Sequence, residues 1–169
     1  RNRHDFFHAL GGRLSDHGMT QCFASFCDFD TAASIFSRAR SGECVHQREE
    51  DQLASFLFLE SGRLDAEKSW TKQLHLGPLR NNNSKLFQQA GRDIGCDSMN
   101  DGRQAESLSL FLDALARENS LPKMVVYNMN PKDSMTLATM IGNFQDPEIP
   151  GKMQYGSGWW YLDTKSGME

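Results

Sequence analysis

Apolar residues recur along the chain in two different periods, and their succession predicts an α/β fold. Short apolar runs that end in turn-forming or polar residues predict strands near residues 10–15, 70–76, 124–127 and 153–155. Between these runs, apolar residues recur at helical spacing. The order strand, helices, strand, helix, strand, helix, strand implies a parallel sheet with right-handed crossover connections.

Two helices in the second half of the chain have clear sequence signals. Four apolar residues fall at i, i+3, i+4 and i+7, namely Leu108, Phe111, Leu112 and Leu115. That spacing predicts an amphipathic helix with one buried face. After the third strand, Asn130 is a good N-cap, Pro131 a good first helical residue and Gly142 a good stop.

The connection between the first two strands is longer than a single crossover needs, and we predict an inserted helical section over about 29–68. Its first helix is predicted to be capped by Asp30 and stopped by Gly42. The second begins at the acidic run Glu49 to Asp51 and ends or kinks at Gly62. The residues predicted to face inward are Ile35, Phe36, Ala39, Leu53, Phe56 and Leu57.

Every predicted strand is followed by unusual polar or aromatic residues at its C-terminal end. Active sites of (β/α)8 barrels are built at that end, and open doubly wound sheets use the same edge. Neither G-x-G-x-x-G nor G-x-x-x-x-G-K-[ST] follows a strand, which argues against nucleotide binding. The pattern favours part of a (β/α)8 TIM barrel over an open sheet, with residues 1–169 forming one partial barrel domain.

Composition and charge narrow the functional classes. The chain has 169 residues, of which 38% are hydrophobic and 24% charged, as expected of one soluble globular domain. Its net charge of -4 argues against a nucleic-acid partner, and its apolar runs are too short to cross a membrane. The four cysteines form no C-x-x-C pair, which favours free thiols and a cytoplasmic location. Because the sequence starts at Arg1 and stops in a polar segment, we expect a fragment of a longer protein.

The densest candidate chemistry lies at the end of the second strand. His75 is followed by Gly77-Pro78, by Arg80 and by three asparagines that begin at Asn81. A neutral imidazole can ligate a divalent metal or act as an acid or base near neutral pH. Arg80 can bind a carboxylate with two hydrogen bonds, and the asparagines can bind sugar hydroxyls. The structural alternatives are a histidine that only packs and a solvated turn.

Two other strand ends add candidates. Asp16 and His17 can orient a hydroxyl, relay a proton or approach a metal, or they can simply cap a loop. In Gly156-Ser-Gly-Trp159-Trp160, one indole can stack on a sugar face while the other packs in the core. Tyr127 and the residues after it are explained mostly by helix capping. The five histidines form neither H-x-H nor H-E-x-x-H, so most ligands of any metal would lie outside this chain.

Several motifs in combination resemble one family, the uronate isomerases (glucuronate isomerases) of the amidohydrolase superfamily. They cover essentially the whole chain in the family's order: Ser15-Asp16-His17-Gly18, Gln73-Leu74-His75-Leu76-Gly77 with Arg80-Asn81-Asn82-Asn83, Leu121-Pro122-Lys123, Tyr127-Asn128 with Asn130-Pro131, Ala138 to Gln145, and Gly156-Ser157-Gly158-Trp159-Trp160. The resemblance implies barrel strands four to seven, from the central-to-late part of a full-length member. The family's H-x-H pair and its metal-binding aspartate would then lie outside residues 1–169.

The resemblance also implies a reaction and its residues. Family members interconvert D-glucuronate with D-fructuronate and D-galacturonate with D-tagaturonate by proton transfer between C2 and C1, through a cis-enediol. It implies a divalent metal, usually zinc, with its main ligands outside this chain, and a homo-oligomer when full length. We expect His75 and Asp16 to be catalytic, with His75 as the one candidate metal ligand here. The residues expected to bind the substrate are Arg80, Trp159, His17 and Asn81.

Two alternatives belong to other functional classes. One is a metal-dependent hydrolase on the same barrel, because a metal-activated water serves many members of that superfamily. The other is a catalytically inactive barrel fragment or carbohydrate-binding module. Four strands cannot close an eight-stranded barrel, so we expect the isolated chain to lack isomerase activity.

Overall fold

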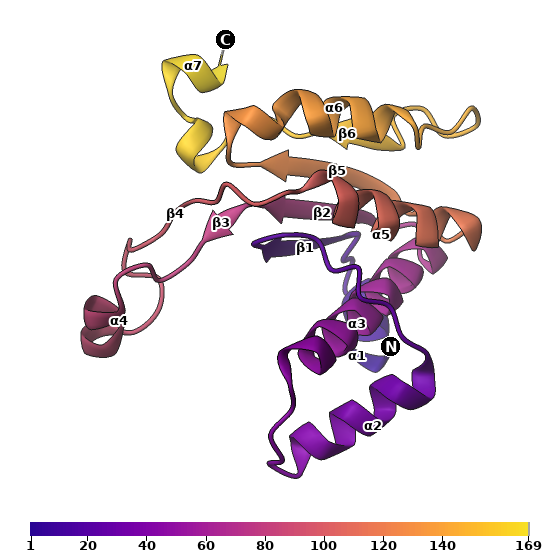
Figure 1. The fold of residues 1–169 in the computed structure, drawn as a ribbon. Helices are drawn as coiled ribbons and strands as arrows, with labels where there is room; N and C mark the ends of the chain where they lie inside the picture. Colours follow the sequence, from indigo (N-terminus) through magenta and orange to yellow (C-terminus); the bar gives the residue numbers. More distant parts are fainter. Residues whose placement is uncertain (169) are drawn as a thin grey trace.

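The four predicted strands form one parallel sheet in the computed structural model, which describes residues 1–168 (Figure 1). The strands are β1 (Leu14–Met19), β2 (Thr71–Leu76), β5 (Lys123–Asn128) and β6 (Met153–Tyr155). Their order in the sheet is β1-β2-β5-β6, which follows the chain without reversal. The predicted α/β fold with a parallel sheet is therefore confirmed. A doubly wound sheet would reverse direction at a switch point, and none occurs among these four strands.

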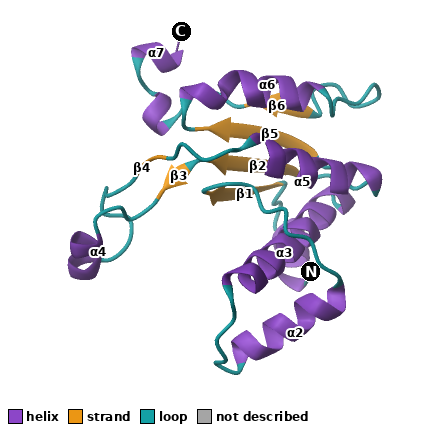
Figure 2. Cartoon of the chain, in the orientation of Figure 1, coloured by secondary structure: helices purple, strands orange, loops and turns teal. Residues whose placement is uncertain are grey.

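Helices cover one face of this sheet in the same order as the strands (Figure 2). Helix α3 (Gln47–Glu67) contacts β2 and α5, whereas α6 (Ser134–Gly142) contacts α5, β5 and β6. Helix α5 (Ala105–Arg117) lies between them. Its four apolar residues at helical spacing are all fully buried, which confirms the predicted face. The core of the protein therefore lies between the sheet and these three helices.

The first strand begins later than predicted. A short helix, α1 (Asn2–Ala9), precedes it, and the strand starts at Leu14 instead of residue 10. Asp16 and His17 therefore lie inside β1 and not after its end. Helix α1 buries none of its residues fully, so it has no apolar stripe by which the sequence could have revealed it.

The long connection after β1 contains α2 (Phe29–Arg40) and then α3. Asp28, not Asp30, caps α2 by accepting a hydrogen bond from the Thr31 N–H. Phe36 and Ala39 are exposed, contrary to the prediction, although Ile35 is buried as expected.

The inward face predicted for α3 is also wrong. Leu53, Phe56 and Leu57 line a groove that faces α2, whereas the buried residues of α3 are Ser55, Phe58, Leu59, Gly62 and Asp65. The helix runs through Gly62 without a break. A Cβ atom at Gly62 would lie 2.7 Å from a methyl carbon of Leu115, so this glycine allows α3 to approach α5 closely.

Two excursions leave the C-terminal ends of the strands (Figure 1). After β2, the two-residue strands β3 (Pro78–Leu79) and β4 (Ser98–Met99) pair antiparallel around α4 (Ser84–Ala90). After β6 come the 3-10 turn η2 (Trp160–Leu162) and α7 (Lys165–Met168). A further 3-10 turn, η1 (Pro131–Asp133), is capped by Asn130 as predicted and leads into α6. No helix among residues 1–168 is both long and apolar enough to cross a membrane.

Candidate functional site

His75 and Asp16 form a hydrogen-bonded pair on the face of the sheet opposite the helices. Alternation along β1 and β2 directs both side chains to this face, and the register sets Gly18 beside His75. The Nδ1 atom of His75 lies 2.7 Å from Oδ1 of Asp16. A carboxylate accepts a hydrogen bond from Nδ1–H, so the neutral imidazole keeps its lone pair on Nε2. That atom is the free acid–base position of the pair.

Aromatic rings enclose the imidazole on both faces. Tyr127 occupies the position on β5 that is in register with His75. The two ring centres lie 4.4 Å apart at an interplanar angle of 7°. On the other side, the Trp159 ring is 4.5 Å away at 28°. His75 is therefore held between two rings, at a place where the sequence indicated only helix capping for Tyr127.

A pocket of about 470 Å³ opens beside this pair. Four of the six predicted site residues line it: Asp16, His75, Arg80 and Trp159. Gly18 and Pro78 complete the lining. Gly18 leaves open space beside His75, since a Cβ atom there would contact nothing within 4 Å. This volume suits a small organic molecule.

Arg80 is held at the pocket by a residue that the sequence did not reveal. Its Nη1 donates a hydrogen bond to Oδ2 of Asp97 at 2.7 Å, and the Asn81 N–H donates to Oδ1 at 2.9 Å. These donors hold the pKa of Asp97 below its usual range, with the backbone N–H as the larger cause. Asn81, at a φ of +57°, thus contributes through its backbone. Asp97 lies in a loop-rich segment with no periodicity, so only the folded chain reveals this contact.

Asp97 and Arg80 also connect the two excursions that leave the C-terminal ends of the strands. The Tyr161 hydroxyl donates to the backbone oxygen of Asp97 at 2.5 Å, and the Arg80 guanidinium lies 4.9 Å from the centre of the Trp160 ring. The loop after β2 and the segment after β6 are therefore tied together next to the pocket.

His17 does not join the other candidates. Because neighbouring residues of a strand point to opposite faces, His17 lies between β1 and α3 while Asp16 faces the pocket. Its ring meets Phe58 edge to face at 5.4 Å, and its Nε2 is 3.5 Å from Oγ of Ser61. Burial lowers the pKa of His17. This geometry gives no support to the predicted contact between His17 and a substrate.

The described part of the chain does not form a metal centre by itself. Within residues 1–168, no group of three or more His, Cys, Asp or Glu side chains is arranged to hold a metal ion. His75 has one nitrogen to offer, since its Nδ1 is engaged by Asp16. The residues present therefore do not fit a complete metal site, and the chemistry below uses only this chain's own groups.

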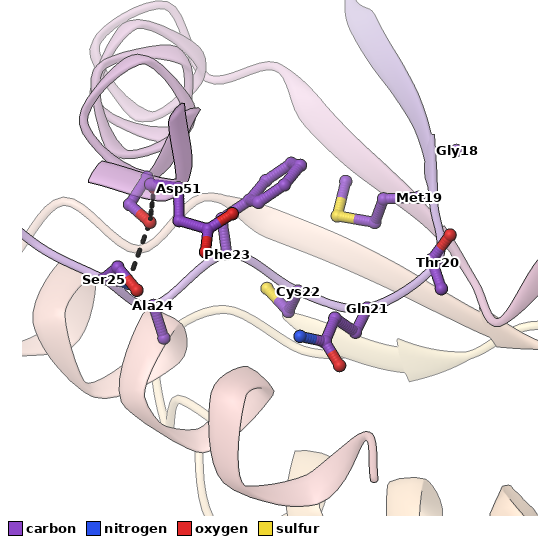
Figure 3. A pocket seen from close by; sticks show the side chains of 10 residues that line it. Gly18, Met19, Thr20, Gln21, Cys22, Phe23, Ala24, Ser25 and Asp51 are labelled. Atoms are coloured by element: carbon purple, nitrogen blue, oxygen red, sulfur yellow. Dashed lines mark hydrogen bonds between the residues drawn. The ribbon is translucent and has the colours of Figure 1, made fainter. Parts of the chain in front are cut away.

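A second pocket, of about 500 Å³, is lined by the end of β1, the loop after it and two residues of α3, Asp51 and Ser55 (Figure 3). Its lining includes Cys22, whose pKa burial raises to about 12, so this thiol is not a nucleophile near neutral pH. The Ser25 N–H donates to the Ser55 hydroxyl at 2.8 Å, which ties the loop to α3. This hollow contains no acid–base pair, so the pocket beside His75 remains the candidate site.

Fold and site together define an α/β protein with a polar acid–base site at the C-terminal edge of a parallel sheet. Comparison with known proteins identifies the family within this class. The family model for glucuronate isomerase matches residues 1–169, so the chain belongs to the glucuronate isomerase family.

Individual relatives agree with this assignment. The chain is 54% identical over its whole length to the uronate isomerases of Opitutus terrae and Solibacter usitatus, and it spans 36% of the length of each. Among solved structures, it matches a Thermotoga maritima uronate isomerase with a TM-score of 0.83 at 29% identity, and a Caulobacter crescentus glucuronate isomerase with 0.77 at 25%. These alignments cover 99% of this chain and 35% and 33% of the two solved chains.

Proposed function

We propose that the full-length protein interconverts aldose and ketose forms of hexuronates, D-glucuronate with D-fructuronate and D-galacturonate with D-tagaturonate. The observation that carries this proposal is a single pocket lined by the His75–Asp16 pair, Arg80 and Trp159. An open-chain uronate needs a cation for its carboxylate, a wall for its carbon chain and an acid–base group near C1 and C2. Each requirement has one matching residue in the pocket.

The proposed roles follow from the contacts. Arg80 uses Nη1 for Asp97, which leaves other N–H donors of its guanidinium for the substrate carboxylate. Trp159 forms the wall beside the carbon chain. Asp16 holds Nδ1–H of His75 and so directs the free Nε2 toward the reacting atoms.

Isomerisation moves one proton between two carbons and leaves the overall composition unchanged. A base removes the proton from C2 while the aldehyde oxygen at C1 is protonated, which gives the cis-enediol. Proton delivery to C1 and loss of the O2 proton then give the ketone. We assign the proton transfers at the oxygens to His75 Nε2: the imidazolium form donates its Nε2 proton to O1, and the resulting neutral form accepts the proton that leaves O2. Asp16 positions a hydroxyl or shuttles the proton.

Several wider properties belong to this proposal. The chain is proposed to be strands four to seven of a (β/α)8 barrel, supported by a strand order without reversal. A divalent metal, usually zinc, would be held by ligands that lie mainly outside this chain, and it would supply Lewis-acid chemistry. A cytoplasmic location is supported by four free cysteines, Cys22, Cys27, Cys44 and Cys96. The resemblance also implies a homo-oligomer, which sedimentation of the full-length protein would test.

The test of this function uses the full-length protein supplied with divalent metal. Incubation with D-glucuronate or D-galacturonate is expected to produce the corresponding ketose, detected by coupled reduction of the ketone. If the protein were instead a metal-dependent hydrolase, it would hydrolyse amides or lactones and form no ketose. The isolated 169 residues are expected to give no turnover, because the sheet has two unpaired edges, β1 and β6.

Replacing Asp97 with asparagine tests the contact that holds Arg80. The amide keeps an acceptor for the Asn81 N–H but loses the charge that attracts the guanidinium, so we expect KM for D-glucuronate to rise about tenfold. The kcat value should change less, because a binding contact present in both ground and transition states acts mainly on KM.

Asp93 provides the matched control for this substitution. It lies 3.6 Å from the same Nη1 atom of Arg80, but its side chain is 84% exposed. Asp93→Asn should therefore leave KM unchanged. Because the pKa of Asp97 is lowered, its contact should persist at all pH values above about 4 and disappear as the pH falls through the lowered pKa. An equal KM change in both variants would contradict the role given to Asp97.

A further inference from the structure

Tyr127 is placed against His75 by the sheet itself. The two residues are in register on neighbouring strands and point to the same face. Their rings are almost parallel, 7° apart, and the ring centres are 4.4 Å from each other. Such nearly parallel contact is characteristic of stacking and leaves the imidazole no freedom to tilt toward β5.

Gly156 holds Tyr127 in this orientation. Its N–H donates to the Val126 carbonyl at 2.8 Å, which fixes the backbone after β6 against β5. A Cβ atom at position 156 would lie only 2.1 Å from Cδ1 of Tyr127. Glycine is therefore required here for space, since any larger residue would push the phenol ring out of its place.

Three contacts together fix the imidazole. Tyr127 and Trp159 cover its two faces, and Asp16 holds its Nδ1 edge at 2.7 Å. Rotation of the ring about its bond to Cβ would break all three contacts. The direction of the Nε2 atom is thus set before a substrate arrives, which is the condition for efficient proton transfer.

We propose that Tyr127, held flat by Gly156, is a positioning residue for His75 in the isomerase reaction. It acts through the face of its ring and not through its hydroxyl. This inference rests on the proposed function, because it concerns the proton transfer assigned to His75.

The kinetic test compares two substitutions in the full-length enzyme. Tyr127→Leu removes the aromatic face and is expected to lower kcat about 10- to 100-fold, the cost of a misplaced catalytic group, with little change in KM. Tyr127→Phe keeps the face and should restore most of kcat. If Tyr127→Phe lost as much as Tyr127→Leu, the hydroxyl would be the acting group and the proposal would be wrong.

A double-mutant cycle separates positioning from a general structural role. In a His75→Asn background, Tyr127→Leu should lower kcat by no more than about a further twofold, since the group it positions is already gone. An independent structural defect would instead multiply the two losses. Tyr155→Leu is the matched control, because this tyrosine donates to Asn128 on the helix side of the sheet, and its effect should multiply with that of His75→Asn.

Nuclear magnetic resonance of the His75 ring protons tests the stacking of Tyr127 on His75 and requires no isomerase activity. Loss of the Tyr127 ring current in Tyr127→Leu should move these signals downfield, whereas Tyr127→Phe should leave them close to wild type. Unmoved signals in Tyr127→Leu overturn the stacking. Moved signals in an enzyme with no isomerase turnover reject the proposed function but support the positioning of His75.

Discussion

The His75→Asn variant of the full-length protein is expected to lose about 10²- to 10⁴-fold in kcat/KM for D-glucuronate, the usual contribution of a positioned acid–base group. Asparagine can still offer an N–H to Asp16, and it fits between Tyr127 and Trp159, so the pocket should persist. It has no nitrogen that can take up or release a proton near neutral pH. Steady-state kinetics with both uronates measures the loss.

Two other histidines make this result specific. His46→Asn changes the exposed N-cap of α3 to another good capping residue and should keep wild-type activity. His17 follows Asp16 in the sequence but lies on the helix side of the sheet. A loss in His17→Asn as large as that in His75→Asn would contradict the face assignment, and a change below about threefold in His75→Asn would exclude its catalytic role.

The Asp65→Ala substitution is expected to destabilise the full-length protein by about 3–5 kcal/mol, measured as a shift in the guanidinium denaturation midpoint. Asp65 accepts hydrogen bonds from Lys72 Nζ at 2.9 Å and from the Ser15 hydroxyl at 2.6 Å, and His4 Nε2 lies 3.0 Å away. The Lys72 and Asp65 side chains are 0% and 1% exposed. Burial lowers the pKa of Lys72, and the carboxylate of Asp65 opposes that shift.

The cost arises because Asp65→Ala leaves the Lys72 ammonium buried, with Ser61 as its closest remaining partner at 2.7 Å. Replacing both partners with apolar residues, Asp65→Leu with Lys72→Met, should recover most of the lost stability. Asp5→Ala is the control, since Asp5 pairs with Lys68 at 2.8 Å but is 44% exposed. Its effect on the denaturation midpoint should be small, because an exposed ion pair contributes little to stability. If the apolar pair were as unstable as Asp65→Ala, the buried charge would not be the cause.

The candidate site was predictable in part. Strand ends with His75, Arg80 and Trp159 were evident from the order of residues along the chain, and the structure brings these residues to one pocket with Asp16. Asp97 and Tyr127 were not, because their importance lies in contacts with residues 17 and 52 positions away in the chain. The placement of His17 on the helix side of the sheet was not predictable, because the pattern could not distinguish a strand end from a strand interior.

By itself, the sequence determined the parts of this protein in which local pattern and burial agree. Strands β2, β5 and β6 and helix α5 follow from runs and spacings of apolar residues, since a residue such as Leu112 is buried wherever its helix meets a core. The family also follows from sequence, through motifs spread along the whole chain.

Tertiary structure alone decided the face of α3 and the partners of His75. The buried side of α3 contains Ser55 and Asp65, which a hydropathy pattern assigns to solvent. Asp65 is buried because Lys72 on β2 neutralises it. The stack on His75 depends in the same way on the register of β2 with β5 and on the space left by Gly156. Pairing between side chains on different elements compensates for the cost of burying polar groups, and the hydropathy pattern of one element does not record such pairing.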